Sequence, residues 1–83
     1  MDNKKIGFKA LVKAIGENYF EQHKENAVFS WGEEDKGLYC FLGINLHPIN
    51  EKITLSCPLD DWDIYASCYV INNEVIMDKC KLP

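Results

Sequence analysis

The chain has 83 residues, of which 47% are hydrophobic, 12% aromatic and 27% charged, and its formal net charge is −4. This length supports one core and not two, and the composition excludes a disordered chain, so we expect a single domain over residues 1–83. All nine basic residues are lysine, so the arginine fork that usually reads phosphate and guanine is missing. Direct nucleic-acid binding is therefore not expected.

The N-terminal region does not have the pattern of a targeting segment. Lys9, Lys13 and Glu17 interrupt its first apolar stretch, and no run of about 18 apolar residues follows that could span a bilayer. We therefore expect a cytoplasmic protein that does not associate with a membrane.

One segment, Phe8 to Glu25, has sustained helical periodicity. Its apolar positions fall within about 100° of arc and predict one buried face; they are Phe8, Leu11, Val12, Ile15 and Tyr19. Phe20 would lie about 120° from this stripe on a continuous helix.

The charged residues of the same segment follow an unusual order, with lysines early and glutamates late, which opposes the helix macrodipole. These residues lie four apart and form a row of Lys5, Lys9, Lys13, Glu17, Glu21 and Glu25. Such a row could match its own reverse on a second antiparallel helix, as a two-fold dimer requires. A row in steps of four turns about 40° per step on a continuous helix, so Lys9 and Glu21 would point about 120° apart. That geometry favours a solvated face over a dimer contact.

From Asn26 the apolar period changes to two, which predicts strands. A hairpin centred on Glu34 and Asp35 pairs two alternating strands; the predicted pairs are Trp31 with Leu38, Phe29 with Cys40 and Ala27 with Leu42. A third alternating set predicts pairs of Leu46 with Ile53, Ile44 with Leu55 and Leu42 with Cys57. Pro48 and Pro58 bound this third strand.

The last hairpin is the clearest, because Asn72 and Asn73 tolerate the positive φ of a type I′ turn. Its predicted pairs are Val70 with Val75, Tyr69 with Ile76, Cys68 with Met77 and Tyr65 with Cys80. Short connections leave no room for a crossover helix. The sequence therefore predicts an α+β fold, with one N-terminal α-helix packed on a four- to five-stranded antiparallel β-sheet, a meander of hairpins.

Once the helix covers one sheet face, large apolar side chains are left on the other face. These residues are Tyr39, Phe41, Tyr65, Tyr69, Ile71 and Ile76. Aromatic clusters on a nominally solvent-facing surface are typical of partner-binding sites, although β-propensity alone also favours tyrosine on an open face. We expect a protein-protein interaction module that binds a protein partner, or a second copy of itself as a homodimer, through this face.

Two acidic segments offer an alternative surface, formed by Glu33, Glu34, Asp35, Asp60, Asp61 and Asp63. A small acidic inhibitor, or a decoy that mimics nucleic acid and blocks a basic groove on a target protein, would carry carboxylates in this way. The second segment lacks the spacing, the glycine and the final glutamate of an EF-hand loop, so no calcium site is expected.

The four cysteines form no C-x-x-C pair and match no zinc or redox motif. The strand pattern places Cys40, Cys57 and Cys68 on the core face, where thiols behave as small hydrophobic groups. Cys80 falls on the outer face and is the one candidate for a reactive thiol. We expect no metal site and no cofactor.

His23 and His47 belong to different predicted elements, and neither has a serine, cysteine or aspartate at a recognisable catalytic spacing. The chain also lacks a glycine-rich loop. We therefore expect no enzymatic activity and assign no catalytic residue.

Overall fold

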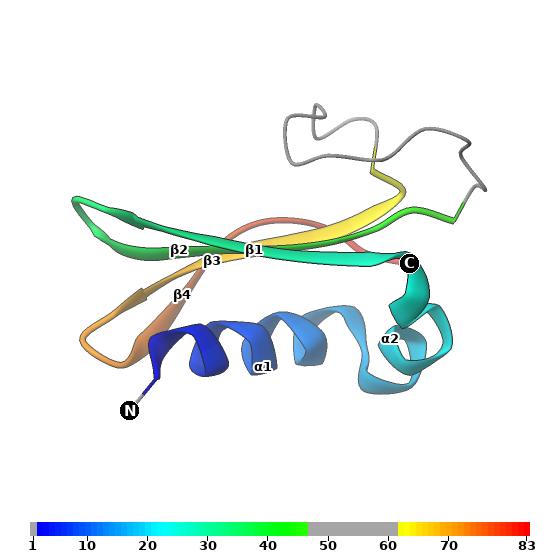
Figure 1. Cartoon of the computed structure of the whole chain (residues 1–83), viewed down its shortest axis with the longest axis horizontal. Coiled ribbons are helices and arrows are strands. Elements are labelled where there is room, and N and C mark those ends of the chain that lie inside the picture. The colour runs from blue at the N-terminus through cyan, green and yellow to red at the C-terminus, as the bar shows by residue number, and fades with distance from the viewer. Residues whose placement is uncertain (1, 47–61) are drawn as a thin grey trace.

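The computed structural model describes residues 2–46 and 62–83. Its elements are α1 (Asn3–Ile15), α2 (Glu17–His23), a short 3₁₀ helix (Lys24–Asn26), β1 (Ala27–Glu34), β2 (Gly37–Ile44), β3 (Ile64–Ile71) and β4 (Glu74–Lys81). The strands form one antiparallel sheet in the order β1-β2-β3-β4, and α1 lies along one face of it (Figure 1). The predicted α+β fold is confirmed, with four strands and a second short helix.

The prediction of one continuous helix from Phe8 to Glu25 is wrong in its middle, whereas the turn before Phe8, which Asp2 or Asn3 can cap, is helical as well. The helix begins at Asn3, because the side chain of Asp2 accepts a hydrogen bond from the Lys4 backbone N–H at 2.9 Å and caps the first turn. Gly16 then ends α1, with a φ of 115° that glycine adopts without strain.

This break changes how the helix charges act. Lys13 lies in the last turn of α1 and Glu17 in the first turn of α2, so each complements the dipole of its own helix. The opposition to the macrodipole that a continuous helix predicts is therefore absent at these two residues. The break also brings the Phe20 ring to 5.6 Å from the Phe8 ring, edge to face, so Phe20 packs against the core.

Beneath α1 the core is formed by aliphatic side chains and two thiols. Its buried members are Leu11, Ile15, Cys40, Leu42, Ile44, Ile64, Ala66, Cys68 and Val70. Gly7 is buried where the helix approaches β2 most closely, since a Cβ at this position would overlap the Sγ atom of Cys40. The predicted stripe is correct in outline, with Leu11 and Ile15 fully buried and Phe8, Val12 and Tyr19 partly buried.

The β1–β2 register differs from the prediction by two residues, so Trp31 pairs with Cys40 and Phe29 with Leu42. The turn consists of Asp35 and Lys36 rather than being centred on Glu34 and Asp35. Gly37 explains the shift, because a Cβ there would lie 2.7 Å from the Val70 carbonyl oxygen. A shift of two residues keeps every side chain on its predicted face.

The predicted pairs of Ile44 with Leu55 and of Leu42 with Cys57 are wrong, because β1 and β3 occupy the two edges of β2. Ile44, for example, pairs with Ala27 on one side and Ile64 on the other. The predicted pair of Leu46 with Ile53 involves a residue outside the described ones. Residues 53–57, including Cys57, lie outside the described residues.

The β3–β4 hairpin is confirmed at its turn, where Asn72 and Asn73 have φ values of 52° and 66°. Its first three pairs are also correct: Val70 with Val75, Tyr69 with Ile76 and Cys68 with Met77. The prediction for Tyr65 is wrong, because a bulge intervenes and Tyr65 pairs with Lys81 while Cys80 pairs with Ala66.

The bulge lies opposite Ser67, which is buried. Its hydroxyl accepts a hydrogen bond from the Lys79 backbone N–H at 3.1 Å and lies 3.4 Å from the Lys79 carbonyl oxygen. These contacts pair backbone groups that the irregular ladder leaves without a strand partner. One consequence is that Cys80 faces the helix side of the sheet and is exposed at its edge, not beside Tyr65.

Candidate protein-binding surface

The predicted aromatic residues share the sheet face opposite α1. We call this surface the aromatic face; it consists of Tyr39, Phe41, Tyr65, Tyr69, Ile71 and Ile76. Cross-strand pairing joins Tyr39 to Tyr69 and Tyr69 to Ile76, so these three form a row across β2, β3 and β4. The structure thus brings the six residues onto one surface, and it also divides that surface into two unlike ends.

At one end the aromatic face is covered by Trp62, which is only 2% exposed. The centres of the Trp62 and Phe41 rings lie 5.4 Å apart. The Tyr65 ring stacks on the Phe41 ring, with 6.1 Å between their centres. The prediction that Phe41 lies exposed is wrong, because its exposed fraction is 7%. Phe41 is therefore buried with Trp62 rather than part of an open contact surface, and Tyr65 beside it is partly buried.

The role of Trp62 was missed in the sequence, although Gly43 carried a signal for it. A Cβ at Gly43 would lie 2.6 Å from the Trp62 ring and 2.8 Å from the Phe41 ring. Glycine inside an apolar strand often marks the close approach of another group, and here that group is the indole.

The other end of the aromatic face is open, and we call it the open end; it comprises Tyr39, Tyr69, Ile71 and Ile76. The two tyrosine rings lie 5.2 Å apart at an interplanar angle of 62°. Ile76 is 49% exposed, and no helix of the described residues lies on this face. The open end is therefore an apolar surface with two phenol groups on it.

Charged side chains border the open end. Lys36 Nζ lies 5.9 Å from the centre of the Tyr69 ring, within reach of a cation–π contact. Desolvation raises the pKa of Tyr69, and its hydrogen bond to the Glu34 carboxylate raises it further. An apolar centre with a polar border is the usual arrangement of a protein interface.

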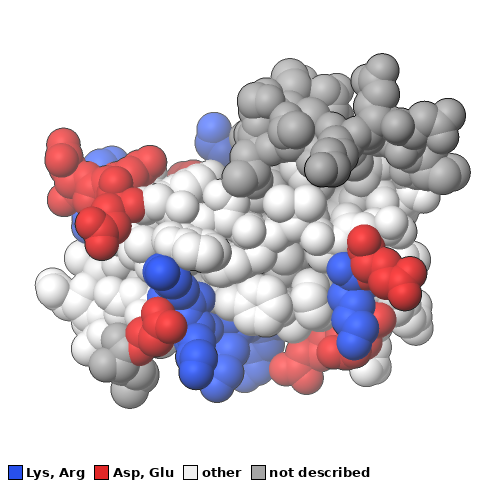
Figure 2. All heavy atoms as spheres, in the orientation of Figure 1, with Lys and Arg blue, Asp and Glu red and all other residues white. Residues whose placement is uncertain are grey.

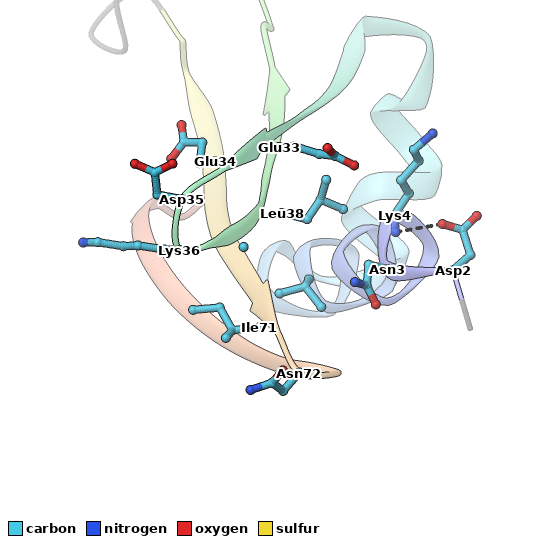
Figure 3. Close-up of a pocket in the computed structure, with 12 residues that line it drawn as sticks. Asp2, Asn3, Lys4, Glu33, Glu34, Asp35, Lys36, Leu38, Ile71 and Asn72 are labelled. Atoms are coloured by element: carbon cyan, nitrogen blue, oxygen red, sulfur yellow. Dashed lines mark hydrogen bonds between the residues drawn. The ribbon is translucent and has the colours of Figure 1, made fainter.

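The acidic residues of the alternative surface are dispersed in the described residues. Glu33, Glu34 and Asp35 line a shallow cavity of about 540 Å³ beside the N-terminus of α1 (Figure 3). Even there, Glu33 lies on one side of the hairpin, and Glu34 and Asp35 lie on the other. Asp63 lies at the opposite end of the sheet and accepts a hydrogen bond from the Leu46 backbone N–H at 2.7 Å.

Asp60 and Asp61, like His47, fall outside the described residues. Within residues 2–46 and 62–83, no group of three potential metal ligands is present. His23 lies against Tyr19, with 4.5 Å between ring centres. The predicted acidic surface is therefore not a continuous feature of the described part of the chain.

Cys40 and Cys68 are paired across β2 and β3 and are both buried. Burial, and then the neighbouring Cys40 thiol, raise the pKa of Cys68 to about 12, and burial also raises the pKa of Cys40. Both thiols are therefore protonated at neutral pH. Because only the thiolate form acts as a nucleophile or a metal ligand, these two cysteines act as core side chains.

The chain matches no protein-family model, no curated protein and no solved structure. Only the surface of the protein itself therefore indicates its function. Among the described helices, none has both the length and the apolar character needed to cross a membrane.

Proposed function

We propose that this protein is a non-enzymatic protein-binding module that docks a protein partner on the open end of its aromatic face. The observation that supports this proposal is the row of Tyr39, Tyr69 and Ile76, in which two partly buried tyrosine rings lie beside an isoleucine that is 49% exposed. Surfaces of this composition lose water on association, and tyrosine is enriched among the residues that dominate binding energy. Free thiols at Cys40, Cys68 and Cys80 fit a reducing compartment such as the cytosol.

Two neighbouring residues of β4 provide a matched test of this proposal. Ile76 lies on the aromatic face, whereas Met77 faces the helix side, and their exposed fractions are similar at 49% and 46%. We expect Ile76→Arg to abolish capture of a partner from a lysate of the native host, and Met77→Arg to leave it unchanged. Circular dichroism and thermal unfolding would establish that both variants fold.

Capture of the same proteins by the wild type and by Ile76→Arg would contradict the proposal, as would capture of none. Equal loss with both substitutions would indicate a general effect of added charge on β4, not a site on the aromatic face.

The acidic inhibitor is the second candidate, and it is supported by less. Of its six carboxylates, the described hairpin contributes three, and these are divided between the two sides of the hairpin. Binding through carboxylates weakens steeply with added salt, whereas binding through the open end depends little on it. Repeating the capture at high salt separates the two candidates.

A further inference from the structure

A second surface, on the helix side of the molecule, follows from the break at Gly16. A groove of about 540 Å³ runs along α1 and α2, and we call it the dipolar groove; its lining residues are Phe8, Lys9, Val12, Lys13, Glu17, Asn18, Phe20 and Glu21. Its apolar members Phe8, Val12 and Phe20 are partly buried against the core. Its charged members are exposed.

The charges of the dipolar groove are separated by sign. Lys9 and Lys13 come from α1, and Glu17 and Glu21 come from α2. Figure 2 shows lysine atoms gathered at the lower left of centre and acidic atoms to their right. A continuous helix would rotate these residues away from one another, whereas α1 and α2 together present them along one groove.

We propose that the protein forms a two-fold symmetric homodimer in which the dipolar grooves of two copies meet in antiparallel orientation. The two-fold axis places the lysines of one copy opposite the glutamates of the other, and the reverse contact follows from the same symmetry. The apolar centre of one groove then contacts the apolar centre of the other. A surface that is complementary to its own reverse is what an isologous interface requires.

The charges are available for such contacts. Within residues 2–46 and 62–83, Lys9, Lys13 and Glu17 form no ion pair. Glu21 pairs with Lys24 at 3.2 Å, but both side chains are well exposed. Exposed pairs of this kind contribute little, so Glu21 can exchange its partner at small cost.

A neighbouring groove extends the same surface and shares Phe8 and Lys9 with the dipolar groove. Phe29 and the exposed Trp31 lie beside it, and Lys4 Nζ lies 4.4 Å from the centre of the Trp31 ring. This apolar extension increases the area that two copies can bury. The aromatic face lies on the other side of the sheet, so the dimer leaves both of its open ends accessible, and the two proposals stand independently.

The test uses two variants of opposite charge. One carries Lys9→Glu and Lys13→Glu, which makes its groove wholly acidic, and the other carries Glu17→Lys and Glu21→Lys, which makes its groove wholly basic. We expect wild-type self-association in the micromolar to millimolar range, measured by analytical ultracentrifugation. Each variant alone should associate at least about tenfold more weakly, because all cross-dimer pairs become repulsive.

Mixing the two variants should restore a dimer that contains one copy of each, because every cross-dimer pair is then attractive. The matched control uses two further variants that are also mixed. One carries both Lys36→Glu and Lys79→Glu, and the other carries both Glu33→Lys and Glu74→Lys. These control chains have the same net charges as the groove variants but leave the dipolar groove intact. They should associate with themselves as the wild type does and show no preference for each other.

A monomeric wild type over the whole concentration range would overturn the proposal. A dimer that is insensitive to both groove variants would also overturn it, since the contact would then lie elsewhere, for example at an open sheet edge. Native circular dichroism spectra of the variants, together with their recovery on mixing, distinguish loss of association from loss of folding.

Discussion

The sheet face beneath α1 carries aliphatic side chains and two thiols and is covered by the helix, whereas on the opposite face of residues 2–46 and 62–83 the indole of Trp62 covers one end. On the helix side, Gly7 and Cys40 allow the helix backbone to approach the sheet closely. On the opposite side, Gly43 allows one indole, Trp62, to lie on the strands. A helix can cover several residues of each strand, but a single ring covers a small area, so among the described residues no such cover reaches Tyr39 and Tyr69, which are partly buried.

This difference indicates which face of the sheet is the candidate binding surface. A covered face is explained by folding alone, since its side chains remove one another from water. The open end has no such explanation in the described residues, and it is where a partner would gain the burial that the chain does not supply. Four stability measurements test the comparison.

The largest expected effect is that of replacing the buried Trp62, and the exposed Trp31 is its control. Trp62→Ala should lower the free energy of unfolding by about 3–5 kcal/mol, because it leaves a cavity over Phe41 and Gly43. Trp31→Ala should cost less than about 1 kcal/mol, because Trp31 is 48% exposed. Equal losses in urea denaturation would contradict the assignment of Trp62 as the cover of that end.

A smaller effect is expected on the helix side. Gly7→Ala should destabilise the protein by about 1–3 kcal/mol, although alanine favours helix, because the added methyl overlaps the Cys40 thiol. Gly32→Ala is the control, since nothing lies within 4 Å of the added carbon, and it should change stability by less than about 0.5 kcal/mol.

The overlap at Gly7 can be tested directly by removing the atom that causes it. In a Gly7→Ala background, Cys40→Ala should cost clearly less than it does in the wild type, because the methyl then occupies the space of the thiol. Additive losses would place the effect of Gly7→Ala elsewhere than at Cys40.

The last expected effect appears only at alkaline pH and concerns the pH dependence of stability. The pKa of Cys68 is raised from 9.0 to about 12 in the folded protein, so the unfolded chain loses this proton first. The stability that the buried thiol contributes is complete below pH 9 and is lost as the pH rises from there toward 12. The contribution to the slope is at most about 1.4 kcal/mol per pH unit.

Chemical denaturation at a series of pH values above 9 should therefore show a shallower decline for Cys68→Ala than for the wild type. Cys80→Ala should keep the wild-type slope, because Cys80 is exposed. An identical slope in all three proteins would mean that the Cys68 thiol is not shielded from solvent as the fold implies.

Much of the fold could be predicted because it depends on local patterns. Alternation assigned each described strand residue before the bulge to its correct face, and this assignment survived the two-residue error in the β1–β2 register, since a shift of two preserves parity. The turn at Asn72 and Asn73 was predictable because few residues other than asparagine and glycine accept its backbone angles. Six residues of the aromatic face were placed on one surface by the same alternation.

The errors arose where a contact distant in sequence decides the local conformation. The Asp35–Lys36 turn depends on Gly37 fitting against Val70, and the bulge in β4 depends on the Ser67 hydroxyl. The burial of Phe41 depends on Trp62, which is 21 residues away in the sequence. None of these contacts has a periodic signal.

Up to the bulge in β4, the amino-acid sequence alone was enough to assign side chains to the two sheet faces, because side chains alternate along a regular strand. Which part of each face is accessible depends on contacts between elements that are distant in the sequence. That depends on how far α1 and Trp62 reach across the strands, and on the break at Gly16 that brings Lys9, Lys13, Glu17 and Glu21 to one groove. The exposed fraction of a strand side chain depends on the groups that cover it, and here those groups belong to another part of the chain.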